Sequence, residues 1–105
     1  VGIFQPHRFT RTQALFDEFT RAFYETDRLV LVPIYSAGEK EIPGISHALL
    51  CEGIQAHGHK NVTCADSFEA ALAFLQEHLR AGDIVMTMGA GDISKLGERL
   101  LEQLA

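Results

Sequence analysis

A cluster of cationic side chains near the start of the chain has the residue types that bind anions. His7, Arg8 and Arg11 lie within the run Phe4-Gln5-Pro6-His7-Arg8-Phe9-Thr10-Arg11-Thr12. An arginine guanidinium presents a planar fork of donors that fits a carboxylate or a phosphoryl group. Cations at the start of a helix are disfavoured by roughly 0.3–1 kcal/mol each unless a counter-charge is present. If a helix begins here, a bound anion explains the cluster; the alternative is a solvated basic surface.

The flanking residues place this cluster at a turn between a strand and a helix. Val1-Gly2-Ile3-Phe4 has the β-branched and aromatic content of a strand, and Pro6 ends it. Thr10 and Gln13 match a capping box, and apolar residues then recur at helical spacing as far as Glu25. We therefore expect a helix over 10–25.

The rest of the chain alternates strand-like and helix-like segments. The continuous apolar run 29–34 is typical of a strand that is covered on both faces. Further strands are expected over 61–65 and 84–88, and further helices over 46–57, 66–79 and 92–104. Repeated strand–helix units with right-handed crossovers predict a doubly wound, three-layer α/β domain with a parallel sheet and helices on both faces. The order of the strands stays open.

Several unusual segments fall where the strands of such a sheet end. Ligands of open α/β sheets bind outside the carboxyl ends of the strands. The cationic cluster lies at that edge, and so does the long polar loop 35–44, from which we single out Tyr35 and Glu39. The loop after the last strand adds Ala90, Gly91 and Asp92 as candidate lining residues. Gly89-Ala90-Gly91 lacks the third glycine of a dinucleotide fingerprint, because Ser94 stands in its place.

Composition excludes several classes of function. A net charge of −5 with only 9 Lys and Arg argues against a nucleic-acid surface. No apolar run approaches the ~20 residues that span a membrane. The two cysteines, Cys51 and Cys64, form no disulfide framework, and we expect buried, reduced thiols in a cytoplasmic protein.

The chain offers no complete set of catalytic residues or metal ligands. His57-Gly58-His59 lacks a cysteine or carboxylate at ligand spacing, so a surface helix end is the favoured interpretation. His47 and His78 are expected to face solvent. Neither cysteine has a base positioned beside it in the sequence. We therefore predict no catalytic residue and no metal site.

Three motifs resemble those of the bacterial Mur ligases, in their carboxy-terminal domain. They are the run 4–12 quoted above, Tyr35-Ser36-Ala37-Gly38-Glu39, and Gly82-Asp83-Ile84-Val85-Met86-Thr87-Met88-Gly89-Ala90-Gly91-Asp92. The resemblance covers nearly the whole chain and implies a Rossmann-like domain, 1–105, that serves in amino-acid binding. The first motif is similar to that of the members that add L-alanine.

The resemblance also implies an activity for the full-length enzyme. ATP phosphorylates the carboxylate of UDP-N-acetylmuramate, the amine of L-alanine attacks the acyl phosphate, and Mg²⁺ ions bridge the phosphates. A UDP-sugar domain and a central ATPase domain supply most of that site. His7, Arg8 and Arg11 match the family residues on the amino-acid and transferring-phosphate side of the cleft.

The family's third domain begins earlier than this chain, with an ATP-binding strand for which we find no counterpart. Val1 already lies inside an expected strand, so we expect a piece of the ligase that is inactive alone and holds no cofactor of its own. The alternative is a free-standing, non-catalytic module that binds a small anion or regulates a partner.

Overall fold

Four short parallel strands form the centre of the computed structural model, which describes residues 1–24, 26–59, 61–90 and 92–104. Within those residues the sheet order is β3-β2-β1-β4, with Ile3 paired to Val30 on one side and Thr87 on the other. The strands are β1 (Gly2–Phe4), β2 (Leu29–Leu31), β3 (Val62–Cys64) and β4 (Met86–Met88). The expected parallel pairing is confirmed, and the strand order, which the sequence left open, is now defined.

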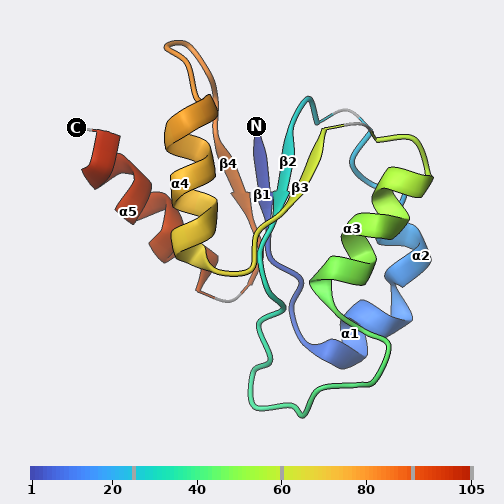
Figure 1. The fold of residues 1–105 in the computed structure, drawn as a ribbon. Coiled ribbons are helices and arrows are strands. Elements are labelled where there is room, and N and C mark those ends of the chain that lie inside the picture. Colours follow the sequence, from blue (N-terminus) through green and yellow to red (C-terminus); the bar gives the residue numbers. More distant parts are fainter. Residues whose placement is uncertain (25, 60, 91, 105) are drawn as a thin grey trace.

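Helices cover both faces of the sheet (Figure 1). One face carries α1 (Phe9–Ala14), α2 (Phe16–Phe19) and α3 (His47–Ala56). The other face carries α4 (Phe68–His78) and α5 (Ile93–Leu104). The doubly wound, three-layer α/β fold predicted from the sequence is confirmed.

The central strand β2 shows why the sequence run 29–34 is continuously apolar. Leu29 and Leu31 pack into the core under α3, whereas Val30 and Val32 pack into the core under α4 and α5. All four side chains are fully buried, because successive residues of a strand point to opposite faces and helices cover both. Ladder pairing nevertheless ends earlier than predicted, just before Pro33, which has no N–H to donate.

The prediction of one helix over 10–25 is wrong, because the helix begins earlier and is divided into two. Helix α1 begins at Phe9, and Arg8 precedes it without a side-chain cap, so Thr10 lies inside the helix and caps nothing. The helical path breaks at Leu15, and α2 ends at Phe19. The Thr12 and Thr20 hydroxyls donate to main-chain carbonyls of the preceding turn, at 2.7 and 2.6 Å, and such bonds bend or end helices.

Serine hydroxyls cap the two middle helices. Ser46, where α3 was expected to begin, accepts the backbone N–H of Leu49 at 3.1 Å. Helix α4 is capped by Ser67, which accepts the N–H of Ala70 at 3.0 Å, so it begins later than predicted. Asp66 therefore remains outside the helix. No helix in the described part of the chain is long and apolar enough to cross a membrane.

Candidate functional site

The carboxyl ends of β1 and β4 meet at the point where the strand connections change direction. From β1 the chain crosses to β2 on one side, and it later returns to β4 on the other side, which is the topological switch point of an open α/β sheet. Gln5 follows β1 and Asp92 follows β4. The Gln5 Nε2 donates to the Asp92 Oδ1 at 3.0 Å, so a direct hydrogen bond joins the two strand ends.

Gly89 allows this close junction. A Cβ at position 89 would lie 3.0 Å from the carbonyl oxygen of Gln5 and 3.1 Å from Ile93. The loop at Gly89 thus lies against the end of the neighbouring strand. This close packing explains why position 89 is a glycine, without a bound ligand. Ala90 is exposed and Gly91 lies outside the described residues.

A cavity of about 380 Å³ opens beside the Gln5–Asp92 hydrogen bond. Tyr35, Ser67 and Arg99 are among its lining residues, and the Arg99 guanidinium pairs with Glu69, which also lines the cavity, at 3.2 Å. Of the predicted loop residues, Tyr35 and Asp92 therefore line one common cavity at the ligand edge of the sheet.

His7 is tied to Tyr35 by main-chain and ring contacts. Their backbones form an isolated parallel bridge, and the Arg8 N–H donates to the Tyr35 carbonyl at 2.7 Å. The two rings stack with centroids 5.6 Å apart and planes 13° from parallel. Loop 35–44 and the cationic cluster, which are far apart in sequence, thus lie side by side as predicted.

The three predicted cationic residues line one open cavity of about 610 Å³ together with Thr10. Arg8 and Arg11 are exposed, and neither guanidinium has a carboxylate oxygen within 4.0 Å among the residues that the structure describes. Arg8 has φ 67°, a left-handed backbone that is uncommon for a side-chain-bearing residue and is often found at functional positions.

Glu39 supplies the negative charge that the first turn of α1 requires. Its Oε2 accepts the Thr10 hydroxyl at 2.7 Å, and its Oε1 accepts the Thr10 N–H at 3.2 Å. The Thr10 hydroxyl holds the pKa of Glu39 below its ordinary value; backbone N–H groups and the Arg8 charge act in the same direction, against partial desolvation. Glu39 therefore fastens the first turn of α1, the helix that carries Arg11, to loop 35–44.

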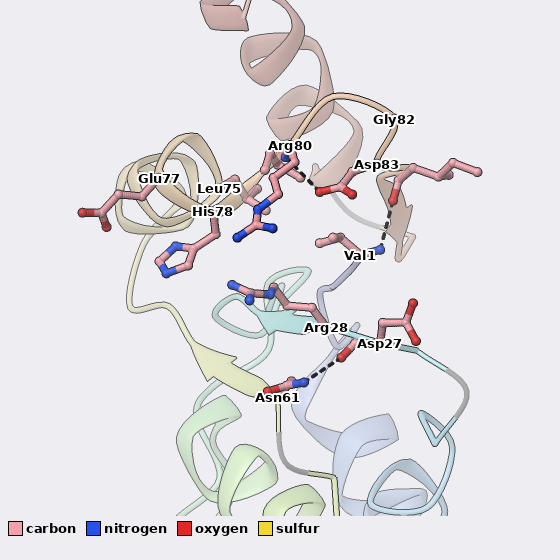
Figure 2. Close-up of a pocket in the computed structure, with 12 residues that line it drawn as sticks. Val1, Asp27, Arg28, Asn61, Leu75, Glu77, His78, Arg80, Gly82 and Asp83 are labelled. Atoms are coloured by element: carbon pink, nitrogen blue, oxygen red, sulfur yellow. Dashed lines mark hydrogen bonds between the residues drawn. The ribbon is translucent and has the colours of Figure 1, made fainter.

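A separate cavity of about 590 Å³ lies at the opposite, amino-terminal edge of the sheet (Figure 2). Figure 2 shows the guanidinium groups of Arg28 and Arg80 reaching into it from opposite sides. Asp83 accepts the backbone N–H of Arg80 at 2.9 Å and lies at this edge. The cavity is remote from the carboxyl ends of the strands, where the predicted site residues gather.

Two histidines differ from their predicted surroundings. His47 was expected to face solvent, but its side chain is only 15% exposed and its Nε2 lies 3.6 Å from the Asp66 Oδ1. His59 was expected at a surface helix end, but it is buried, with Nε2 2.6 Å from the Thr26 carbonyl oxygen. Both predictions fail because the packing partners come from distant parts of the chain.

The structure also assembles a group that the sequence analysis missed. One ligand-type atom from each of His47, Cys64 and Asp66 lies within 4.8 Å of the others. The expectation of no metal site stays a prediction, but the sequence analysis did not foresee this grouping. The i, i+4 spacing of His47 and Cys51 and the i, i+2 spacing of Cys64 and Asp66 are the signals that could have indicated it.

The order of the parallel strands and the helices on both faces define a Rossmann-like α/β domain. Residues 1–91 match the family model described as "Mur ligase, glutamate ligase domain". The chain therefore belongs to the Mur ligase family.

Relatives with curated names agree with this assignment. The chain is 59% identical, over its whole length, to a protein of Desulforapulum autotrophicum named UDP-N-acetylmuramate–L-alanine ligase. Proteins with the same name from Syntrophotalea carbinolica and Desulfosudis oleivorans are each 54% identical, over 99% and 96% of the chain. The chain spans 23%, 23% and 22% of the length of these three relatives.

Proposed function

We propose that the chain acts as the carboxy-terminal domain, 1–105, of an ATP-dependent ligase that joins L-alanine to UDP-N-acetylmuramate in peptidoglycan synthesis. The observation that carries this proposal is the 59% identity, over all 105 residues, to a ligase of that name. In the reaction, the amine of L-alanine attacks an acyl phosphate of the muramate carboxylate. The rest of the ligase, a UDP-sugar domain and a central ATPase domain, is the partner of this chain in the cytoplasm.

His7, Arg8 and Arg11 are proposed to bind the amino acid and the transferring phosphoryl group. Their common cavity and the two exposed guanidinium groups support this role. An arginine fork fits the carboxylate of L-alanine, and positive charge near the reacting phosphoryl group stabilises the negative charge that develops there.

Two observations on the described residues support a proposal that ATP and Mg²⁺ are bound mainly elsewhere in the ligase. The Gly89 backbone packs closely against Gln5, which leaves little space there for a phosphate. The only group of potential metal ligands found among the described residues includes a thiol, which Mg²⁺ disfavours. We therefore propose that ATP and Mg²⁺ are held mainly by the other domains.

A chimera tests the proposal. The matching segment of the Desulforapulum autotrophicum ligase is replaced by this chain, and release of phosphate that depends on both L-alanine and UDP-N-acetylmuramate is measured. We expect turnover by the chimera and none by the isolated chain. The unmodified relative and the relative with the segment deleted are the controls. A folded chimera without turnover contradicts the ligase assignment, and turnover by the isolated chain contradicts its role as a single domain of a larger enzyme.

The exposure of Arg8 and Arg11 also favours a second candidate, a non-catalytic module that binds a small anion. It predicts that the isolated chain binds pyrophosphate or a free amino acid by itself, and that Arg8→Ala and Arg11→Ala abolish this binding. A chimera that is inactive while the isolated chain binds such an anion would select this candidate.

A further inference from the structure

The group formed by His47, Cys64 and Asp66 lies outside the cavities described above and has no part in the proposed ligase site. His47 is the first residue of α3, Cys64 is the last residue of the edge strand β3, and Asp66 follows two positions later. Cys64 ends β3 and Asp66 lies in the bend that follows, and a ligand-type atom of each lies within 4.8 Å of one of His47. Packing of α3 on β3 thus brings the three side chains together.

The spacing of the three side chains suits a small metal ion. Zn²⁺ binds nitrogen and oxygen at about 2.0–2.2 Å and sulfur at about 2.3 Å in tetrahedral geometry, so two of its ligand atoms lie roughly 3.4–3.8 Å apart. The His47 Nε2 and the Asp66 Oδ1 are 3.6 Å apart, and all three ligand atoms lie within 4.8 Å of one another. The Asp66 side chain is 93% exposed, so it is free to move by the remaining distance.

A simple His–Asp ion pair explains the group less well. An exposed carboxylate contributes little to an ion pair, because water screens it and its side chain is free to rotate. The His47 Nε2 is inaccessible to water and has no hydrogen-bond partner among the described residues. The Asp66 Oδ1 at 3.6 Å lies just beyond hydrogen-bond distance, so this buried nitrogen has room for a closer partner.

Cys51 lies in α3 close to the group formed by His47, Cys64 and Asp66. It lies one helical turn after His47 on the same face of α3 and is buried. A buried shell of this kind beside a metal site limits the access of solvent to the ligands. A thiolate, an imidazole and one carboxylate form a ligand set that suits Zn²⁺ or Co²⁺ and does not suit Mg²⁺.

We propose that His47, Cys64 and Asp66 bind one divalent transition-metal ion of the zinc type, which fastens the start of α3 to the end of β3. The ion occupies a site with three protein ligands, and its fourth position is open to water. This proposal is independent of the ligase assignment and holds for the chain alone.

Co²⁺ is the probe of choice, because a thiolate ligand gives it a charge-transfer absorption that carboxylates and imidazoles do not give. We expect the reduced chain to bind one Co²⁺ with this absorption, and one equivalent of Zn²⁺ to displace it. Cys64→Ser should abolish the absorption. His47→Gln and Asp66→Asn should weaken Zn²⁺ binding by roughly tenfold or more, the scale at which even supporting residues of metal sites act.

Matched variants distinguish this site from adventitious binding. His57→Gln changes an exposed histidine at the other end of α3, and Asp17→Asn changes an exposed carboxylate elsewhere; both should bind Zn²⁺ as the unmodified chain does. Cys51→Ser should keep the thiolate absorption. The proposal is overturned if the folded, unmodified chain shows no thiolate absorption, or if the absorption survives Cys64→Ser.

A measurement on the unmodified chain keeps the test valid if a variant fails to fold. Zn²⁺ should shift the NMR resonances of the His47 imidazole and leave those of His57 and His78 in place. It should also raise the unfolding temperature, because the ion binds the folded chain more tightly than the unfolded one. An unchanged His47 resonance at saturating Zn²⁺ would contradict the assignment of this ligand.

Discussion

Glu39 caps the first turn of α1 from a loop 29 residues away, through hydrogen bonds that both the hydroxyl and the backbone N–H of Thr10 donate to its carboxylate. The sequence offers two explanations for His7, Arg8 and Arg11 at this helix start: a bound anion or a solvated basic surface. Glu39 places a carboxylate of the chain itself at that helix start. What remains available for an external ligand is the pair of exposed guanidinium groups beside it.

Replacing Glu39 should loosen α1 and disorder the cationic cluster. Glu39→Ala removes both acceptors of Thr10, so we expect faster hydrogen exchange at the Thr10 amide and a lower unfolding temperature. Glu41→Ala, an exposed change on the same loop, is the matched control and should leave both unchanged. Unaltered exchange at Thr10 in Glu39→Ala would show that this contact does not hold the helix.

The same contact should make α1 sensitive to acid. Because folding lowers the pKa of Glu39 from its ordinary value of 4.5, the contact stabilises the fold fully above that value and loses its effect as the pH falls through the lowered pKa. The NMR shift of the Thr10 amide should therefore titrate with a midpoint below 4.5. In Glu39→Gln that titration should vanish, and a transition that persists would assign it to another group.

The fold was predictable where sequence patterns reflect burial. The unbroken apolar run around Val30 indicated a strand covered on both faces, and the strand–helix alternation indicated parallel pairing. The break at Leu15 was not predictable, because hydrophobic periodicity does not report the threonine hydroxyls that compete for main-chain carbonyls. Strand order was not readable either, since long-range packing decides which edges meet.

The candidate site was predictable only in its local part. His7, Arg8 and Arg11 are neighbours in sequence, so residue types and a strand–helix turn were enough to place them together. The contact of Glu39 with Thr10 and the approach of His47 to Cys64 join distant segments. No short-range pattern specifies such contacts, because they depend on how a loop returns or how a helix packs against a strand.

Arg11 should contribute to use of the amino acid in the chimeric ligase described above. Arg11→Ala removes one charged hydrogen bond, worth roughly 1.5–3 kcal/mol, so we expect kcat/KM for L-alanine to fall by about 10–100-fold. Arg21→Ala changes another exposed arginine, outside the cavity that holds Arg11, and should leave the kinetics unchanged. If kcat/KM for L-alanine is the same in Arg11→Ala and Arg21→Ala, the proposed role of Arg11 is contradicted.

The hydrogen bond between Gln5 and Asp92 should stabilise the junction of β1 and β4. Asp92→Ala leaves the buried Gln5 amide without its acceptor, which costs about 1–3 kcal/mol of unfolding free energy. Urea unfolding of the chain measures this loss. Asp27→Ala, an exposed carboxylate at the other edge of the sheet, is the control and should unfold like the unmodified chain.

Replacing each of two helical glycines by alanine should change the unfolding free energy in opposite directions. A Cβ at Gly53 in α3 would lie 2.7 Å from the Thr20 Cγ2, whereas one at Gly97 in α5 would meet the Thr87 Cγ2 at an ordinary 3.5 Å. Alanine is favoured over glycine in a helix by up to about 1 kcal/mol, so Gly97→Ala should raise the unfolding free energy by about 0.5–1 kcal/mol.

At Gly53 the steric cost should exceed this gain. Thr20 is buried, and its hydroxyl is committed to the Asp17 carbonyl, so its methyl group cannot move aside without breaking that bond. Overpacking of this kind costs typically about 1–3 kcal/mol, so Gly53→Ala should lower the unfolding free energy by about 1 kcal/mol. Urea unfolding of both variants tests the pair, and stabilisation by Gly53→Ala would mean that α2 and α3 pack less closely than their contact at Thr20 indicates.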